Sequence, residues 1–417
     1  MRNLLTDVAG IAVGHATDLA LGSGVTAILF DPPATAAVSV LGGAPGGRDT
    51  GLLAPEMTVE AVDAIVLSGG SAFGLDAAGG VQAALREMGR GYAIRDARIP
   101  IVPQAIIFDL LNGGNKDWGR FSPYRELGYL AAQAAAAQAA AAQSLAASPG
   151  AAKPDAVQSG IAQLGEAQSG EAQPGEAHLA ATDFALGSVG GGTGATTATI
   201  KGGLGSASAR TEAGHTIGAI AIVNAVGSPL IGTGPWFWAA PFEQDREFGG
   251  LGWPTRIDTT MRLKGSPAIG TTRIGAAGIS TTGISTTGIS TTGISTTGIS
   301  TTGRSATATS TTIGLVATDA ALTKPQALRL AIMAHDGLAR AVLPAHAPLD
   351  GDTIFAAATG RRPLGNALSE LTALGFAATL VMARAIARGV HAATALPVPG
   401  AQPAWRDRFG ATHSGIP

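Results

Sequence analysis

The 417-residue sequence contains no cysteine. Disulfides, cysteine-ligated zinc, iron-sulfur clusters and cysteine nucleophiles are therefore excluded, so a nucleophile must be a serine, a threonine, a lysine or a carboxylate. Charged residues are also scarce, at 13%, and the net charge is only -2. This balance provides neither the basic surface that binds nucleic acid nor a polybasic patch for membrane lipids. It favours a small-molecule or peptide substrate.

Long apolar runs are missing as well. No stretch approaches 18 uninterrupted apolar residues, because glutamines break the alanine-rich run after Tyr129. The first fifteen residues lack the apolar segment of a signal peptide and include Asp7. We therefore predict a cytoplasmic protein. The seven histidines are scattered and show no H-E-x-x-H pattern, so we expect neither a metal nor a cofactor.

The chain is long enough for one large α/β domain or two ordinary ones. Apolar spacing predicts strands over residues 11–13, 25–30, 37–41, 63–67, 99–102, 105–108 and 216–223. It predicts helices over residues 75–85, 325–342 and about 363–389. Glycine-rich motifs join several of these elements.

Two low-complexity tracts interrupt this pattern. Residues 130–181 contain AAQAAAAQAAAAQ followed by imperfect GEAQ units, with no apolar stripe beyond alanine. We expect this tract to be an inserted, partly helical or disordered surface segment outside the core. Residues 278–303 repeat Gly-Ile-Ser-Thr-Thr five times. A flexible linker is the favoured interpretation of this tract, and stacked β-helical pentapeptides are the alternative.

The second tract leads into STTIGLVATD, residues 310–319, where hydroxyl-rich sequence becomes an apolar run typical of a buried strand. A threonine at the start of a strand, after a flexible segment, is where a self-processing hydrolase would expose an N-terminal nucleophile. We therefore predict cleavage between Ser310 and Thr311. The new α-amine, with a reference pKa of about 7.7 to 8.0, would then be the base that a threonine hydroxyl needs.

The tripeptide Ser-Thr-Thr cannot by itself identify the cleavage site, because every repeat in residues 278–303 contains it. Only the copy that begins at Ser310 is followed by an apolar strand. A nucleophile attached to a core strand can be held in a catalytic geometry, whereas one inside a flexible linker cannot. The downstream strand therefore selects Thr311.

Other polar residues are ambiguous when each is taken alone. Asp350 and Asp352 precede a predicted strand and could point toward one end of the sheet, but Asp-Gly-Asp is also a common turn. The motif SGGSAFGLD resembles a serine elbow only loosely, because its spacing is wrong. The motif GSVGGGTGATTATIKGG lacks the spacing of a phosphate-binding loop.

Seven motifs taken together resemble the DmpA-type aminopeptidases, and most of all the nylon-oligomer hydrolases, which cleave themselves into a large α and a small β subunit. The matching segments are GIAVGHATD, GGAPGGRDT, IVLSGGSAFGLDAAGGV, FALGSVGGGTGATTATIKGGLGSAS, IAIVNAVGSP, STTIGLVATDAALTKPQA and PLDGDTIFAAATG. They cover most of the chain outside the two tracts. The resemblance implies an α+β fold, a four-layer αββα sandwich.

The resemblance also implies the chain's organisation. Residues 1–310 would be the α subunit, residues 311–417 the β subunit, and both would form one catalytic domain. A homotetramer is implied in the same way.

Carried over residue by residue, the resemblance makes Thr311 the nucleophile and places Lys201 beside it. It assigns Asn224 to the active site as a possible oxyanion donor. Asp350 and Asp352 become an acidic pair, which we expect to orient Lys201 and the α-amine.

Two points of the family pattern need comment. Nylon hydrolases have asparagine before the cleaved bond, whereas this chain has Ser310. The acyl shift uses only the carbonyl of residue 310, so serine should be tolerated. The family also has an active-site tyrosine, for which Tyr124 and Tyr129 are both candidates.

The resemblance implies a self-processing threonine amidohydrolase or aminopeptidase that cleaves short peptides or ω-amino acid oligomers such as 6-aminohexanoate oligomers. A β- or D-aminopeptidase with esterase activity and an acyltransferase resembling ornithine acetyltransferase are the enzymatic alternatives. A non-catalytic, glycine-rich assembly protein is the alternative from another class.

Overall fold

The computed structural model describes residues 1–147, 183–265 and 310–413. The repeats at 278–303 lie outside the described residues, as does the first tract beyond residue 147. The strands are β1 (Ile11–Asp18), β2 (Ser23–Val40), β3 (Gly47–Arg48), β4 (Ala61–Ser68), β5 (Tyr92–Ile94), β6 (Ala97–Ile99), β7 (Gln104–Ile106), β8 (Gly203–Arg210), β9 (Thr216–Asn224), β10 (Thr311–Ala320) and β11 (Thr353–Arg362). The helices are α1 (Ala77–Glu87), α2 (Tyr124–Ala147), α3 (Lys324–Ala341), α4 (Ala367–His391) and α5 (Trp405–His413).

Nine of these strands belong to one hydrogen-bonded system in the order β3-β7-β4-β2-β11-β10-β9-β8, with β1 paired to β2. β10 lies between a parallel β11 and an antiparallel β9. The two strands predicted at 25–30 and 37–41 are wrong as separate elements, because β2 is continuous over 18 residues. Its pairing with β4 shifts register between Leu29 and Ala34, where the two prolines lie. Proline lacks the N–H that a ladder needs, so the pairing is interrupted while the strand continues.

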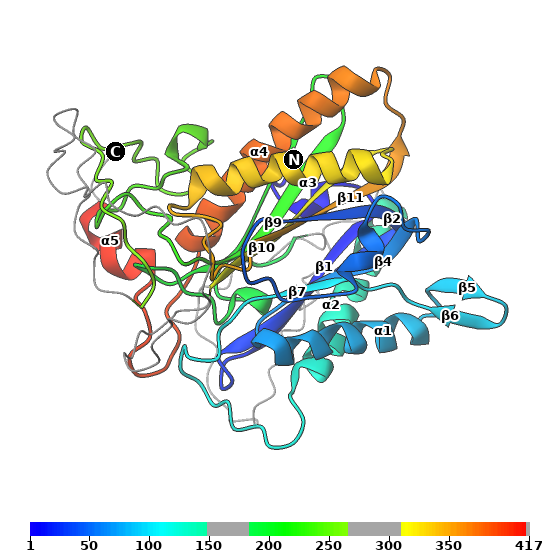
Figure 1. Cartoon of the computed structure of the whole chain (residues 1–417), viewed down its shortest axis with the longest axis horizontal. Coiled ribbons are helices and arrows are strands. Elements are labelled where there is room, and N and C mark those ends of the chain that lie inside the picture. The colour runs from blue at the N-terminus through cyan, green and yellow to red at the C-terminus, as the bar shows by residue number, and fades with distance from the viewer. Residues whose placement is uncertain (148–182, 266–309, 414–417) are drawn as a thin grey trace, which may run out of the picture.

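Three apolar cores separate four layers, as expected for an αββα sandwich. Consecutive residues of β10 point into different cores: Leu315 packs in the core between the two parts of the sheet, and Val316 packs in the core shared with α3 and α4. This alternation follows from the two-residue period of a strand. The third core joins β1, β2 and β4 to α1 and α2. In Figure 1, α3 and α4 cover one side of the strands and α1 and α2 the other.

Helix α2 corrects the prediction that residues from 130 onward stay outside the core. Ala131, Ala132 and Ala135 are fully buried in the core with β1 and α1. A Cβ added at Gly14 of β1 would lie 2.2 Å from the Ala131 carbonyl oxygen and the Ala135 nitrogen. An alanine-rich helix can therefore be buried here, because the small side chains of α2 let the helix approach β1 closely enough to exclude water.

Helix α4 is long and apolar enough to span a membrane by length and composition alone, but 61% of its most apolar window is buried inside the protein. It packs against α3, β8 and β9. Its hydropathy is therefore accounted for by its place in the core.

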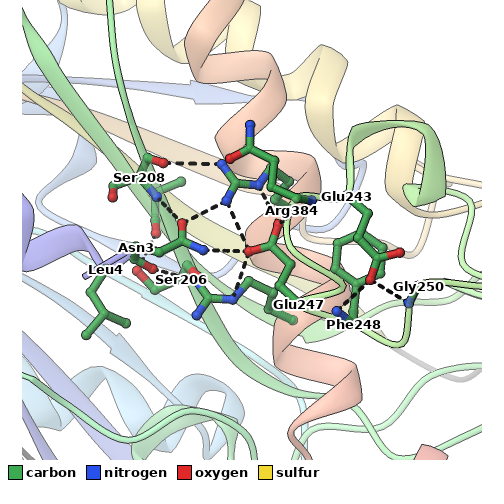
Figure 2. A network of polar contacts seen from close by, with 12 residues as sticks. Asn3, Leu4, Ser206, Ser208, Glu243, Glu247, Phe248, Gly250 and Arg384 are labelled. Carbon is green, nitrogen blue, oxygen red and sulfur yellow. Dashed lines mark hydrogen bonds and ion pairs between the residues drawn. The ribbon is translucent and has the colours of Figure 1, made fainter. Parts of the chain in front are cut away.

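A buried polar network ties the N-terminus to α4 and to the segment around residue 247 (Figure 2). The Glu247 carboxylate bonds Arg384 Nε at 2.5 Å, Arg388 Nε at 3.3 Å and Asn3 Nδ2 at 2.5 Å. Arg384 Nη1 also donates to the Ser208 carbonyl at 3.2 Å. One carboxylate thus neutralises two arginines in the interior.

We expect Glu247→Ala to lower the free energy of unfolding by about 3–5 kcal/mol, because it leaves two arginines buried without their counter-ion. Denaturant unfolding of the variant and the parent measures this change. The control is Asp258→Ala, which removes an ion pair with Arg262 in which the Asp258 side chain is 45% exposed. That change should stay within about 1 kcal/mol, and equal losses for the two variants would contradict the role of the buried network.

Candidate active site

Thr311 is the first residue of β10 and is buried in the middle of the strand system. All ten residues of β10 are buried, because the strand is covered on both faces and flanked on both edges. Its Cα partner in β9 is Asn224. Directly opposed residues of an antiparallel pair have Cβ atoms about 4.5–5.5 Å apart and share one face. The register therefore places the Asn224 and Thr311 side chains together.

The peptide unit between Ser310 and Thr311 is held from several directions. The Ser310 carbonyl oxygen accepts a hydrogen bond from the Gly351 N–H at 2.9 Å and lies 2.5 Å from Thr311 Oγ1, which donates to it. The Ser310 N–H donates to the Leu349 carbonyl at 3.2 Å. Ser310 is thus fixed as a short parallel bridge with Asp350.

The two aspartates lie beside this bond and are both buried. Asp352 Oδ1 accepts from the Thr312 N–H at 2.8 Å, and its Oδ2 accepts from the backbone N–H of His346 at 2.9 Å and bonds His346 Nδ1 at 2.8 Å. Among the described residues, the Asp350 carboxylate accepts two long bonds, both of 3.3 Å, from the backbone N–H groups of Val226 and Ala347. Burial and the neighbouring Asp352 charge raise the pKa of Asp350 well above its usual range.

The motif GGAPGGRDT covers this acidic turn. Ala44 N–H donates to the Asp350 carbonyl at 2.7 Å, and a Cβ added at Gly42 would lie 2.2 Å from the Asp352 nitrogen. Glycine is required there because the two backbones touch. One of the motifs that carry the family resemblance thus packs against the predicted site.

Asn224 has a side-chain amide held at both ends. Its Oδ1 accepts from the Thr196 N–H at 3.0 Å and from Lys264 Nζ at 2.9 Å, and its Nδ2 donates to the Phe108 carbonyl at 3.1 Å. The second Nδ2 hydrogen has no partner among the described residues. An amide with a spare N–H, on the residue that pairs with the predicted nucleophile, is suited to hold an oxyanion.

Lys201 lies apart from the aspartates. Its Nζ donates to three backbone carbonyls, those of Gly192, Ala195 and Gly202, at 3.3, 2.8 and 3.0 Å. Within residues 1–147, 183–265 and 310–413 it makes no ion pair with Asp350 or Asp352, so the expected orientation of Lys201 by those aspartates is not present. Burial lowers the pKa of Lys201 to about 7, opposed by the nearby Asp109 charge and assisted by Lys264.

The lowered pKa of Lys201 predicts how the free energy of unfolding depends on pH. Between pH 7 and 10 the unfolded chain keeps the lysine proton that the folded chain has lost, so the parent should gain stability as pH rises, by up to about 1.4 kcal/mol per pH unit. Lys201→Met should lose this contribution and keep the smaller gain that comes from Lys264, whose pKa burial lowers to about 8. Urea unfolding at pH 7 and pH 9, in a Thr311→Ala background so that one chain unfolds, measures the difference. Parallel behaviour of the two proteins would contradict the buried-ammonium interpretation.

The two tyrosines are placed very differently. Tyr124 is fully buried, and its hydroxyl donates to Ser23 Oγ at 3.0 Å, which in turn donates to Asp109 Oδ2 at 2.6 Å. Burial raises the pKa of Tyr124. Tyr129 lies at the surface and bonds Glu87. Only Tyr124 belongs to the buried polar interior near the charge of Asp109.

The serine-elbow motif has a packing role. Gly70 N–H donates to Asp109 Oδ1 at 2.7 Å, and a Cβ at Gly70 would lie 2.2 Å from the Tyr124 ring. Ser71 has a backbone φ of 53° and has no histidine partner within the described part of the chain. This loop therefore supports Asp109 and Tyr124.

The sequence did not indicate three groups that lie at the candidate site, namely Lys264, His346 and the Gly351 N–H. Lys264 is not part of a motif in the sequence. His346 stands four residues before Asp350 and is not part of a metal-binding motif. Only the Gly of Asp-Gly-Asp could have suggested a backbone donor. Among the described residues, no cluster of three or more histidine, aspartate or glutamate side chains could hold a metal ion.

A polar cleft of about 240 Å³ adjoins Asn224 through Thr196, and its lining includes Asn112 and Gln402. A larger hollow of about 380 Å³ lies between the N-terminal ends of α3 and α4. Neither hollow is lined by a predicted site residue, but the smaller one includes Thr196, whose N–H donates to Asn224.

Comparison with known proteins identifies the family of the chain. The model of peptidase family S58 matches residues 3–151 and 150–402. An uncharacterized aminopeptidase of Mycobacterium tuberculosis is 36% identical over 425 residues, covering 98% of each chain. An uncharacterized aminopeptidase of Mycobacterium leprae is 34% identical over 366 residues, covering 86% of this chain and 79% of the relative.

Two solved structures share the fold. The β-aminopeptidase of a Burkholderia species has a TM-score of 0.57 at 20% identity, covering 100% of this chain and 96% of its own. The L-aminopeptidase D-Ala-esterase/amidase of Ochrobactrum anthropi, a variant of the N-terminal-nucleophile hydrolase fold, has a TM-score of 0.56 at 18% identity, covering 95% and 88%. Both the predicted α+β fold and the predicted family are confirmed. The chain belongs to peptidase family S58 and is a peptide-bond hydrolase of the aminopeptidase type.

Proposed function

We propose that the protein cleaves its own Ser310–Thr311 bond and then acts as an N-terminal-threonine aminopeptidase. The 2.5 Å contact of Thr311 Oγ1 with the Ser310 carbonyl oxygen carries the proposal. It places a nucleophile against one buried peptide bond whose oxygen already has the Gly351 N–H as a donor.

Self-cleavage proceeds as an acyl shift followed by hydrolysis. Thr311 Oγ attacks the Ser310 carbonyl carbon, and the Gly351 N–H holds the oxygen that becomes negative. The C–N bond breaks as the hydroxyl proton passes to the Thr311 nitrogen, leaving an ester between residue 310 and Thr311 Oγ. Water then hydrolyses the ester to a Ser310 carboxylate and a Thr311 with free amine and hydroxyl.

Turnover repeats this chemistry on a substrate amide. The Thr311 α-amine takes the hydroxyl proton as Oγ attacks, and the same proton passes to the leaving amine. Asn224 Nδ2 and the Gly351 N–H are the proposed oxyanion donors. Asp352 positions the nucleophile through the Thr312 N–H, Asp350 lies beside the α-amine, and Lys201 supports the turn that carries Thr196 through its carbonyl contacts.

We propose that residues 1–310 and 311–417 remain one unit after cleavage. β10 and β11 come from the second part, yet their neighbours β9 and β2 come from the first. The pieces therefore share both a hydrogen-bonded sheet and two apolar cores. Separation would expose all of this surface at once.

The proposed substrates are short peptides and other amides with a free amino group, including β-amino acid, D-amino acid and 6-aminohexanoate amides. The small polar cleft beside Thr196 supports a compact substrate over a folded protein. A cytoplasmic location and a homotetramer remain predictions, which fractionation and light scattering would test.

A denaturing gel with N-terminal sequencing tests self-cleavage directly. We expect a small fragment that begins Thr-Thr-Ile-Gly. Active protein that stays a single chain would overturn the proposal, and a fragment starting within the repeats would move the nucleophile. Parallel assays on aminoacyl p-nitroanilides, and on acetylornithine with glutamate, separate a hydrolase from an acyltransferase.

A further inference from the structure

Lys264 reaches the candidate site from a segment in which no motif stands out. Its backbone N–H donates to the Val226 carbonyl at 2.9 Å, so this segment runs alongside the residues that follow β9. Its ammonium lies 2.9 Å from Asn224 Oδ1 and 3.4 Å from the Thr196 carbonyl oxygen. Val226 in turn donates its N–H to Asp350. Lys264 is therefore joined to two of the predicted site residues, directly to Asn224 and through Val226 to Asp350.

The contacts of Asn224 determine which way its amide faces. Two donors, Lys264 Nζ and the Thr196 N–H, meet Oδ1, and one acceptor, the Phe108 carbonyl, meets Nδ2. If the amide were turned over, its NH2 group would face those two donors and its oxygen would face a carbonyl. Both contacts would be repulsive, so only one orientation is stable. That orientation leaves one N–H of Nδ2 without a partner among the described residues, on the residue that pairs with Thr311 across the two strands.

We propose that Lys264 is a positioning residue that holds the Asn224 amide with its N–H toward the oxyanion of the reaction. This inference rests on the proposed function of Thr311 and Asn224, and it adds a residue that the family resemblance did not supply. Lys264 itself contacts neither Thr311 nor the Ser310 carbonyl in the described structure.

The positive charge of Lys264 adds to its role in orientation. A cation at the oxygen end of an amide polarises the group, so its N–H becomes a stronger donor where negative charge develops. Burial lowers the pKa of Lys264 to about 8, with Asp109 and Asp350 opposing the shift. A hydrogen bond from a neutral amine would still orient the amide, whereas an apolar side chain would not.

A double-mutant cycle tests the proposal with alanine and D-alanine p-nitroanilides as probes. We expect Lys264→Met to lower kcat about 10- to 100-fold with little change in KM, because Asn224 then loses its fixed orientation. Lys264→Arg should recover most of the loss, since it restores a donor to Oδ1. In an Asn224→Ala background, Lys264→Met should change kcat less than about twofold, because a residue that acts through another has no effect in its absence.

Lys324→Met is the matched control. Lys324 is also buried and donates to three carbonyls, those of Leu52, Met57 and Val59, at 2.9–3.1 Å, at the start of α3. Its loss should affect stability and leave kcat unchanged. An equal fall in kcat for both lysine variants, or an undiminished effect of Lys264→Met without Asn224, would overturn the inference.

Different results would contradict the proposed function and the role of Lys264. If Thr311→Ala stays active, the N-terminal threonine mechanism itself is wrong. If Thr311→Ala is inactive while Lys264→Met and Lys264→Arg keep parental kcat, only the role of Lys264 is wrong. If Lys264→Met does not fold, Lys264→Ala in both backgrounds completes the same cycle, because alanine also gives Asn224 Oδ1 no donor.

Discussion

Thr311→Ala is expected to remain a single uncleaved chain and to lose amide hydrolysis by roughly 10⁴-fold or more, as when the nucleophile of a serine protease is removed. The variant keeps the buried β10 backbone and the Gly351 contact, so its fold should be intact. What it lacks is the only hydroxyl within 2.5 Å of the Ser310 carbonyl oxygen among the described residues. A denaturing gel and a p-nitroanilide assay measure the two losses together.

The neighbouring threonine provides the control for this experiment. Thr312 is equally buried, but its Oγ1 has no hydrogen-bond partner in the described structure. Thr312→Val removes a hydroxyl one residue away and should leave both cleavage and kcat close to those of the parent. Thr311→Ser should retain both activities at a reduced rate. If Thr312→Val is not cleaved while Thr311→Ala is, Thr311 is not the nucleophile and Thr312 is the candidate in its place.

Asn224→Asp is expected to lower kcat about 10²- to 10³-fold, the usual effect of removing one oxyanion donor. The substitution preserves size and keeps an oxygen for Lys264 and Thr196, but it replaces the donating NH2 with a second acceptor. KM should change little, because the lost hydrogen bond forms only as the oxygen becomes negative. Steady-state kinetics on the same p-nitroanilides separates the two constants.

The same substitution at an exposed asparagine controls for the added charge. Asn115 lies in a surface loop, where its side chain accepts from the Asp117 N–H. Asn115→Asp should leave kcat unchanged. If Asn224→Asp raised KM with kcat unaffected, Asn224 would bind the ground state and would not be an oxyanion donor.

The self-cleavage and turnover schemes share one chemical species. In the proposed mechanism, the ester between residue 310 and Thr311 Oγ would be an acyl group on the nucleophile beside a free α-amine, and so would the acyl-enzyme formed from a substrate. A site that stabilises one therefore stabilises the other. This equivalence explains why the Gly351 N–H, already bound to the Ser310 carbonyl, is a natural candidate for both steps.

Several local features were predictable because they depend on neighbours in the chain. Apolar spacing located β9, β10, α3 and α4 nearly to their observed ends. The division of β2 and the burial of α2 were missed for a shared reason. Whether a proline pair ends a strand, or an alanine face is buried, depends on which element lies against it, and that partner is not encoded in the spacing of residues.

The sequence by itself determined the candidate nucleophile, since Thr311 is the one Ser-Thr-Thr copy joined to an apolar strand, and it determined that no cysteine chemistry is available. Only the tertiary structure decided how the polar groups are shared: Asp352 binds the Thr312 N–H, Asn224 faces Thr311, and Lys264 holds Asn224. The two members of each of these contacts stand 40 or more residues apart in the sequence. Strand register and loop packing bring them together, and local hydrophobic patterns carry no information about which distant side chains will meet.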